Sequence, residues 1–390
     1  MKEIGILEFH FHIKYLNTTM RITKGKNTNV TVFTTEKILE RIKTYTKDLS
    51  DFDFVLKRPD ETVNQFLKRV ERICNDKIDL LFINTIQTSL IDAPHYINFK
   101  PKSKTIITVH MLNHWFKANI GFNIRNLFRS IDATLSIHLI RKLLLPKFNA
   151  VNVIYKPMKV FLEENTDYKK PIFTIPFNFY DNTTKKVKAE NNGKIRVVVP
   201  GLIEAYRRDY DLVIDVFEGL FNKYKDKVIL DILGKPVGKA GWAIVDRCKM
   251  LKDKGYNIIF SEGFVPEKDY DERMRESDII FSPLNVVTKR DTGITEKYGL
   301  SEGSALPFEA IQYCKPLLVP KEFKVIDELK TSALTYSDRS DLEKIFVDLI
   351  DNKKSISNLK KQAYINSGYF TIENLNKYFE EKILSKLNKL

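Results

Sequence analysis

Short, continuous apolar runs alternate with segments of helical periodicity along most of this chain. Residues 78–84 (IDLLFIN) and 104–110 (KTIITVH) are such runs, and residues 63–74 carry apolar side chains at helical spacing. Runs of this kind are typical of strands buried on both faces of a parallel sheet, whose connections need helices. Further strands are expected at residues 3–9, 29–34, 133–137, 150–154 and 172–175. The pattern predicts βαβ units and a doubly wound α/β sheet.

The alternation restarts after a polar stretch at residues 180–193 (YDNTTKKVKAENNG). Strands are expected beyond it at residues 195–199, 228–233, 258–260, 279–282 and 316–319, again with helices between them. The chain therefore divides into an N-terminal α/β domain (1–180), a linker (181–193), a second α/β domain (194–365) and a C-terminal helix (366–390). We expect two Rossmann-like lobes, with the last helix packing back on the first lobe. Because ligands bind beyond the carboxyl ends of parallel strands, we also expect a ligand cleft between the lobes.

Composition excludes several classes of protein. The chain has 390 residues, of which 43% are hydrophobic, so it can bury large cores and is neither disordered nor collagen-like. Its three cysteines, Cys74, Cys248 and Cys314, are far apart and form no CxxC pair, which predicts reduced thiols rather than disulfides or a zinc site. The sequence contains no run of 18 apolar residues, and its first residues (MKEIGILEFHFH) do not resemble a signal peptide. These features predict a cytoplasmic protein.

Positive charge is concentrated in the first half of the chain. Residues 1–190 contain 31 basic and 19 acidic residues, whereas residues 191–390 contain 33 and 31. A basic lobe attracts polyanions, which can be nucleic acid, an anionic membrane surface or a phosphorylated ligand. Residues 123–147 add a basic helical face with an apolar edge, formed by Arg125, Arg129, Arg141, Lys142 and Lys147 among leucines. This stretch is either an ordinary core helix or a peripheral contact with the inner face of a membrane.

The most informative segment is residues 295–319 (TEKYGLSEGSALPFEAIQYCKPLLV). Small residues precede a helix that begins near Pro307, so Ser304, Ala305 and Leu306 present backbone N–H groups at a helix N-terminus. That arrangement is suited to a diphosphate. Glu309, one turn into the helix, can accept two hydroxyl hydrogen bonds from a ribose, and Glu302 can hold another hydroxylated ring. The alternative is that both glutamates only stabilise the helix N-terminus.

Three stretches in order, 200–217 (PGLIEAYRRDYDLVIDVF), 260–283 (FSEGFVPEKDYDERMRESDIIFSP) and 295–319, resemble the donor-binding domain of GT-B glycosyltransferases. The likeness is greatest to glycosyltransferase family 4 and its retaining relatives, and it covers about 180 residues. It implies a retaining, metal-independent transferase that needs no cofactor and takes a sugar from a nucleotide diphosphate, with UDP and GDP both open. The acceptor would be a glycan or a lipid-linked sugar in cell-surface polysaccharide or glycoconjugate synthesis.

The resemblance also implies roles for individual residues. Gly201 follows the first strand of the second lobe, and Arg208, or else Arg207, neutralises the donor diphosphate. Phe264 and Val265 lie against the nucleobase, and Glu302 and Glu309 form the family's pair of glutamates. This chain departs from the family in three places. Six residues rather than seven separate the glutamates, Leu202 replaces an arginine, and the longer insert at 285–299 is expected to cover the donor as a lid.

Three histidines of the first lobe are candidate site residues. His110 ends a buried strand at the position where relatives carry a histidine that faces the donor sugar, so the resemblance implies that it is catalytic. His10 and His12 follow the first strand and are expected on the acceptor side. Relatives have a glycine-rich loop there, which this chain lacks. His95, His114 and His138 have no supporting pattern.

Two other functions stay open. A nucleotide-sugar epimerase or hydrolase can use the same two-lobed fold, but it needs additional carboxylates in the first lobe, and the sequence shows no clear set. The charge also allows a non-catalytic nucleic-acid-binding protein. No helix-turn-helix, zinc-finger or RNA-recognition signature supports that function, so no nucleic-acid partner is expected.

Overall fold

The protein folds into two compact α/β units in the computed structural model, which describes residues 1–46, 48–87, 92–116, 135, 140–182, 193–289 and 294–387. Unit 1 comprises Met1–Asn178, Lys289–Gly303 and Ile372–Leu390, and unit 2 comprises Phe179–Thr288 and Ser304–Thr371. The expected linker residues 183–192 and most of the expected strand at 133–137 lie outside the described residues, as do Arg125, Arg129 and His138. The domain boundaries expected from the sequence stay predictions.

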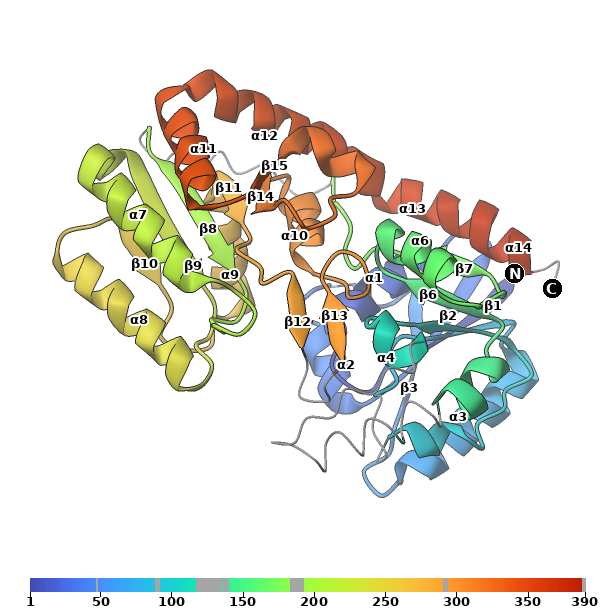
Figure 1. The fold of residues 1–390 in the computed structure, drawn as a ribbon. Helices are drawn as coiled ribbons and strands as arrows, with labels where there is room; N and C mark the ends of the chain where they lie inside the picture. Colours follow the sequence, from blue (N-terminus) through green and yellow to red (C-terminus); the bar gives the residue numbers. More distant parts are fainter. Residues whose placement is uncertain are drawn as a thin grey trace. The chain divides into compact units, whose positions relative to one another are not determined.

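Unit 1 is built on a seven-stranded parallel sheet with the order β3-β2-β1-β4-β5-β6-β7 (Figure 1). Its strands are β1 (Lys2–Leu7), β2 (Thr28–Thr34), β3 (Phe52–Leu56), β4 (Leu80–Ile83), β5 (Lys104–Thr108), β6 (Ala150–Val153) and β7 (Ile172–Thr174). The helices between them are α1 (Ile13–Thr23), α2 (Glu36–Ile42), α3 (Val63–Lys77), η1 (Ala93–Tyr96), α4 (Leu112–Phe116), η3 (Ile140–Leu144), η4 (Leu145–Lys147) and α6 (Lys156–Asn165). The apolar runs of β1, β4 and β5 are buried, as expected for central parallel strands.

The C-terminal segment completes unit 1. Helix α13 (Ile372–Tyr378), η8 (Phe379–Leu384) and α14 (Ser385–Leu387) follow one another, and α13 packs against α1. The Asn376 amide donates to the carbonyl of Lys24 at 2.7 Å, and the ring of Phe379 lies 6.0 Å from that of Phe82. The expectation that the last helix packs on the first lobe is therefore confirmed.

Unit 2 contains a six-stranded parallel sheet with the order β10-β9-β8-β11-β14-β15 (Figure 1). Its strands are β8 (Ile195–Pro200), β9 (Val228–Leu233), β10 (Ile258–Phe260), β11 (Ile279–Phe281), β14 (Leu317–Pro320) and β15 (Ala333–Tyr336). Its helices are α7 (Tyr210–Tyr224), η5 (Lys225–Lys227), α8 (Gly238–Asp253), α9 (Glu267–Glu276), α10 (Leu306–Tyr313), η6 (Asp327–Ser332), α11 (Arg339–Asp351), α12 (Lys353–Ser367) and η7 (Gly368–Phe370). Two parallel Rossmann-like sheets confirm the expected fold class.

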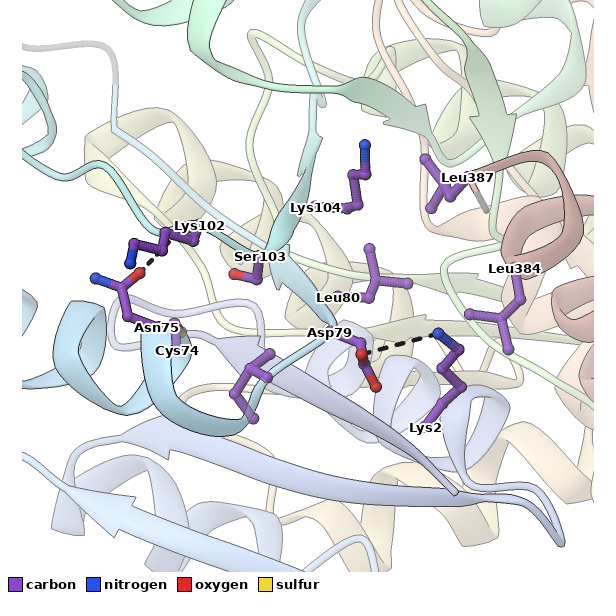
Figure 2. Close-up of a pocket in the computed structure, with 11 residues that line it drawn as sticks. Lys2, Cys74, Asn75, Asp79, Leu80, Lys102, Ser103, Lys104, Leu384 and Leu387 are labelled. Atoms are coloured by element: carbon purple, nitrogen blue, oxygen red, sulfur yellow. Dashed lines mark hydrogen bonds and ion pairs between the residues drawn. The ribbon is translucent and has the colours of Figure 1, made fainter. Parts of the chain in front are cut away.

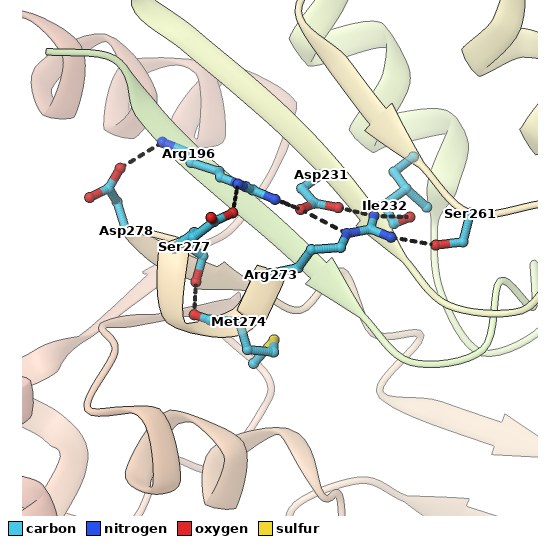
Figure 3. Close-up of polar contacts among 9 residues, drawn as sticks. Arg196, Asp231, Ile232, Ser261, Arg273, Met274, Ser277 and Asp278 are labelled. Carbon is cyan, nitrogen blue, oxygen red and sulfur yellow. Dashed lines mark hydrogen bonds and ion pairs between the residues drawn. The ribbon is translucent and has the colours of Figure 1, made fainter. Parts of the chain in front are cut away.

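A buried ion network joins three elements of unit 2 (Figure 3). Arg196 on β8 donates to the Asp231 carboxylate on β9 at 2.6 Å, and Arg273 on α9 pairs with the same carboxylate. Arg273 also donates to the Ser261 hydroxyl, just after β10, at 2.7 Å. Because Asp231 is fully buried, its charge is tolerated only while both arginines are present. The network therefore holds α9, and the loop that precedes it, against the sheet.

A short pair of strands, β12 (Val287–Lys289) and β13 (Thr295–Lys297), brings the chain from unit 2 into unit 1. The segment from Ile294 to Gly303 then packs on unit 1. The N–H of Leu112 donates to the carbonyl of Ser301 at 2.7 Å, and the buried Glu296 accepts from His114 Nδ1 at 3.0 Å. The described C-terminal part of the insert at 285–299 is thus bonded to α4 through Glu296 and His114, and its expected role as a lid over the donor stays a prediction.

Candidate functional site

Both sheets place polar residues where the strand order reverses. In unit 1 this point lies between β1 and β4, and in unit 2 it lies between β8 and β11. Crossover connections leave the sheet in opposite directions there, so a crevice opens beyond the carboxyl ends of the strands. Of the residues singled out from the sequence, His10 and His12 follow β1 at the first of these points, and Gly201, Arg207 and Arg208 follow β8 at the second.

Gly201 and Arg208 form the centre of the unit 2 site. Gly201 follows β8 with a φ of +100°, and a Cβ at this position would lie 2.5 Å from Nη2 of Arg208. Only glycine allows the guanidinium to lie so close to the backbone. Arg208 is 8% exposed, and it donates through Nη1 to the carbonyl of Leu202 at 2.7 Å. The structure thus holds a nearly buried cation beside Gly201, and the resemblance implied that this arginine neutralises the donor diphosphate.

Arg207 is differently placed. Its Nε lies 3.6 Å from the Glu204 carboxylate, and its side chain is one-third exposed. The carbonyl of Arg207 accepts from the N–H of Asn285 at 3.0 Å, which ties this turn to the loop after β11. Of the two arginines, Arg208 is therefore the one that faces Gly201.

Glu309 lies in the first turn of α10 and is 8% exposed. The Tyr270 hydroxyl on α9 donates to Glu309 Oε1 at 2.8 Å. Burial and the neighbouring Glu309 raise the pKa of Tyr270 well above its usual value, whereas Arg208 lowers that pKa. The charges of Arg208 and Glu309 therefore both act on the Tyr270 hydroxyl. Tyr270 was missed in the sequence, because a tyrosine in a charged helix carries no signal of its partner.

The helix N-terminus differs in one detail from the expectation. Helix α10 begins at Leu306, with Pro307 in its first turn, and Ser304 and Ala305 precede it. The N–H group of Leu306 was expected to be free, but it donates to the Ser304 hydroxyl at 3.3 Å. A serine hydroxyl is a weak partner at this distance, and an anion can replace it.

Phe264 and Val265 lie in the loop between β10 and α9. Phe264 is 81% exposed, and both residues line a hollow of about 430 Å³ whose wall also includes Arg273. An aromatic side chain so exposed on a loop held by the Arg273 network is available to a planar ligand.

Glu302 is not part of unit 2. It was expected beside Glu309 on the second lobe, whereas the structure places Glu302 in unit 1 and Glu309 in unit 2. A single antiparallel bridge pairs Glu302 with Met111, and the N–H of the next residue, Gly303, donates to the carbonyl of His110 at 3.2 Å. Glu302 therefore belongs with the His110 loop.

The unit 1 site consists of histidines near the buried carboxyl group of Glu8. Glu8 follows β1 and is fully buried, Thr85 follows β4, and His110 follows β5. The Thr85 hydroxyl donates to Glu8 Oε2 at 2.5 Å and lies 2.7 Å from Nδ1 of His12. The rings of His12 and His110 lie 4.2 Å apart. His10, His12 and His110, which the sequence pattern had singled out, thus meet in one cluster.

A second carboxyl group, that of Asp92, contacts the same cluster. Asp92 Oδ2 lies 3.3 Å from Nε2 of His10 and accepts from the N–H of Gln87 at 2.9 Å. His110 Nε2 lies 3.3 Å from the carbonyl oxygen of Asn84, so this nitrogen carries the proton. Glu8, Thr85 and Asp92 were missed in the sequence. The strand-end rule could have identified Glu8, but the first strand was expected to extend to residue 9.

Burial sets the protonation of the cluster. It raises the pKa of Glu8 to about 7, against the opposing hydrogen bonds from Thr85, His10 and Phe11. It lowers the pKa of His12 to about 2 and that of His110 to about 4. The two histidines are therefore neutral at physiological pH, and Glu8 exchanges its proton there.

A separate pocket of about 380 Å³ lies at the opposite edge of the unit 1 sheet, where β1, β4 and β5 begin (Figure 2). Lys2, Lys102 and Lys104 line it, and Lys2 lies 3.8 Å from Asp79.

Within the described part of the chain, no helix has both the length and the apolar character needed to span a bilayer. Among the same residues, no group of three or more His, Cys, Asp or Glu side chains is placed to hold a metal ion.

No protein-family model and no curated protein matches this chain. Solved structures do match. The Anabaena protein HepE in complex with UDP matches over the full length of both chains, with a TM-score of 0.63 and 12% identity. The N-terminal domain of trehalose-6-phosphate phosphatase from Candida albicans matches with a TM-score of 0.60 and 12% identity, over 98% of this chain and 96% of that one. UDP-N-acetylglucosamine 2-epimerase from Neisseria meningitidis, bound to its UDP-sugar, matches with a TM-score of 0.52 and 15% identity, over 99% and 100%.

The chain has a GT-B-like fold. All three likenesses lie at 15% identity or below, so they show the fold alone. The same architecture occurs in a UDP-binding protein and in an epimerase, so architecture by itself does not decide between a transferase and an epimerase.

Proposed function

We propose that this protein is a nucleotide-sugar-processing enzyme, specifically a retaining, metal-independent glycosyltransferase. It would move a sugar from a nucleotide diphosphate sugar to a glycan or lipid-linked acceptor in cell-surface polysaccharide or glycoconjugate synthesis. The observation that carries the proposal is the nearly buried Arg208 cation, which contacts Gly201. Its charge and that of Glu309 both act on the Tyr270 hydroxyl. A buried cation at the strand-order reversal of a parallel sheet is suited to a phosphate group.

In this mechanism unit 2 holds the leaving nucleotide. Negative charge grows on the diphosphate as the bond to the sugar breaks. The Arg208 guanidinium and the N–H groups before α10 stabilise that charge in place, without requiring a metal ion. Glu309, oriented by the Tyr270 hydroxyl, accepts the ribose hydroxyls, and Phe264 and Val265 contact the base. The similar structures that contain UDP or a UDP-sugar favour UDP over GDP as the nucleotide.

Unit 1 supplies the sugar and acceptor side. His110 would contact the transferred sugar, and His10 and His12 would contact the acceptor. Glu302 would act beside His110, to whose loop it is bridged. The surplus of basic residues in positions 1–190 supports a peripheral contact with the inner face of an anionic membrane, in the cytoplasm. We propose no nucleic-acid partner, because the sequence carries no nucleic-acid recognition signature.

One observation favours the second candidate, a UDP-sugar epimerase or hydrolase. No clear set of first-lobe carboxylates for that chemistry was expected from the sequence, but Glu8 and Asp92 lie within the histidine cluster. Carboxyl groups beside neutral histidines can remove and return protons on a sugar.

A thermal-shift series tests nucleotide binding. UDP and UDP-sugars at 100 times their Kd should stabilise the protein by about 2.7 kcal/mol. Arg208→Gln and Glu309→Gln should reduce this shift, whereas Arg207→Gln, which removes the half-buried ion pair with Glu204, should leave most of it. A wild-type protein whose melting temperature does not change with UDP, GDP or their sugars would refute the proposal.

The products separate the two activities. Incubating the enzyme with a UDP-sugar alone should leave the sugar unchanged if it is a transferase, and should release free or epimerised sugar otherwise. With an acceptor, NMR of the product should show the donor's anomeric configuration. An inverted anomer would rule out the retaining mechanism.

A further inference from the structure

Glu8, Thr85 and His12 form a continuous hydrogen-bonded chain in unit 1. Glu8 follows β1, Thr85 follows β4, and His12 directly precedes α1, so three elements contribute one residue each. The distances are 2.5 Å from Thr85 Oγ1 to Glu8 Oε2 and 2.7 Å from Thr85 Oγ1 to His12 Nδ1. Glu8 is fully buried and Thr85 is 5% exposed, whereas His12 is half-buried. The chain therefore runs from the interior to a ring that solvent can reach.

The other oxygen of Glu8 fixes where its proton can lie. Glu8 Oε1 accepts the N–H of His10 at 2.7 Å. An oxygen that accepts from a backbone N–H is a poor site for a proton, so the proton of the neutral acid lies on Oε2, facing Thr85.

A threonine hydroxyl has one proton, so the chain has two states. When Glu8 is ionised, Thr85 donates to Glu8, and His12 must donate its Nδ1 proton to Thr85. The lone pair of His12 is then on Nε2. When Glu8 is protonated, it donates to Thr85, Thr85 donates to His12 Nδ1, and His12 carries its proton on Nε2.

We propose that Glu8, Thr85 and His12 are a proton relay that removes a proton from a bound sugar or acceptor hydroxyl and deposits it on Glu8. The inference rests on the proposed function and deepens it. The substrate O–H bond breaks as His12 gains a proton on Nε2. The Nδ1 proton passes to Thr85, and the Thr85 hydroxyl proton passes to Glu8 Oε2. His12 is neutral before and after, and the carboxylate becomes a carboxylic acid.

The electrostatics of the site fit a relay better than a lone histidine base. Burial and the neighbouring His110 and His10 lower the pKa of His12 to about 2, so a stable imidazolium there is unfavourable. Burial raises the pKa of Glu8 to about 7, which suits a proton acceptor working near neutral pH. The titratable groups around Glu8 and His12 are His10 on the same loop, Asp92 and Tyr96 at η1, His110 after β5, and Tyr15 on α1. Of these, Asp92 adds to the rise of the Glu8 pKa.

The first test needs no substrate. NMR of labelled histidine in the free protein should show His12 with its proton on Nδ1 above a midpoint near pH 7 and on Nε2 below it. Glu8→Gln, whose amide donates to Thr85 as the acid does, should hold the Nε2 form at every pH. The His95 signal, whose ring lies against Asn64 rather than Glu8, should be the same in both proteins. A His12 tautomer that is identical in wild type and Glu8→Gln would overturn the relay.

The second test uses turnover of a UDP-sugar. Glu8→Gln and Thr85→Val should each lower kcat by about 10²-fold or more with little change in the donor KM, and Thr85→Ser should restore most of kcat. A Glu8→Gln variant that keeps the wild-type kcat would also overturn the relay. If the wild type turns over no nucleotide sugar, the proposed function fails, and the tautomer measurement still decides the relay.

A stability measurement separates lost chemistry from lost fold. The folded-state pKa of Glu8 lies above its unfolded value of 4.5, so wild-type stability falls as the pH rises through this range towards about 7. Glutamine never ionises, so Glu8→Gln should melt at a higher temperature than wild type at pH 8 and show no such gain at pH 5. An inactive variant that is also more stable at pH 8 supports the relay, whereas one that is less stable at both pH values points to a packing role.

Discussion

Single backbone positions decide whether the unit 2 site can form. Gly201 has a φ that other residues rarely adopt, and the guanidinium of Arg208 occupies the space where a Cβ would lie. The nearby Gly234 is equally constrained, because a Cβ there would meet the carbonyl of Gly201 at 2.0 Å. The two glycines let the ends of β8 and β9 approach each other beneath the arginine.

Replacing Gly201 with alanine should therefore damage both fold and binding. We expect a loss of about 1–3 kcal/mol in the free energy of unfolding. Displacement of Arg208 should also weaken UDP binding by about tenfold or more. Urea denaturation and calorimetric titration measure the two effects.

Gly219 provides the control for that substitution. It lies in α7 with nothing within 4 Å of its missing Cβ, so Gly219→Ala should stabilise the protein by about 0.5–1 kcal/mol and leave UDP affinity unchanged. Equal effects of the two substitutions would contradict the role given to Gly201.

At the scale of elements, the position of α9 depends on the buried ion network. Tyr270 and the loop with Phe264 and Val265 are both attached to α9, so a shift of this helix would move two parts of the candidate donor site together. Arg196, Asp231 and Arg273 hold the helix to β8 and β9 (Figure 3).

Asp231→Ala should destabilise the protein by about 3–5 kcal/mol, because it leaves two largely buried arginines without their shared carboxylate. The exposed pair of Lys254 and Glu218 is the matched control, and Lys254→Ala should cost less than about 1 kcal/mol. Urea unfolding of both variants measures the difference. An Asp231→Ala protein as stable as wild type would show that the arginines find other partners.

At the scale of the whole molecule, unit 1 is assembled from three separate stretches of sequence. The C-terminal segment contributes the Asn376 bond to Lys24 and the Phe379 ring beside Phe82, so it is part of the unit 1 core. A chain that lacks it exposes the apolar face of α1 that α13 covers.

Deleting residues 372–390 should lower the melting temperature of unit 1 and leave that of unit 2 nearly unchanged. Differential scanning calorimetry with and without UDP distinguishes the two, because UDP should raise only the transition of unit 2. Phe379→Ala should move the same transition by less than the deletion does. A loss confined to the UDP-sensitive transition would contradict this assignment.

The sequence alone predicted the architecture, and it named residues of the candidate site whose roles stay predictions. Continuous apolar runs predicted the central strands because central parallel strands are buried on both faces. The edge strands β3 and β15 were missed because they are only partly buried and carry no such run. Glu309 was predicted from its place in the first turn of a helix, whereas Gly201 and Arg208 were expected from the resemblance to GT-B glycosyltransferases. The structure places Gly201 and Arg208 in contact, and their roles stay predictions.

Only the tertiary structure decided what those residues meet. Thr85 and Glu8 are 77 positions apart, and sequence spacing carries no signal of a 2.5 Å contact between them. Glu302 stands seven positions before Glu309, yet the chain passes from unit 1 into unit 2 between them. A residue's local conformation depends on its neighbours in the chain, whereas its pKa and its partners depend on burial and on distant strands, which only folding brings together.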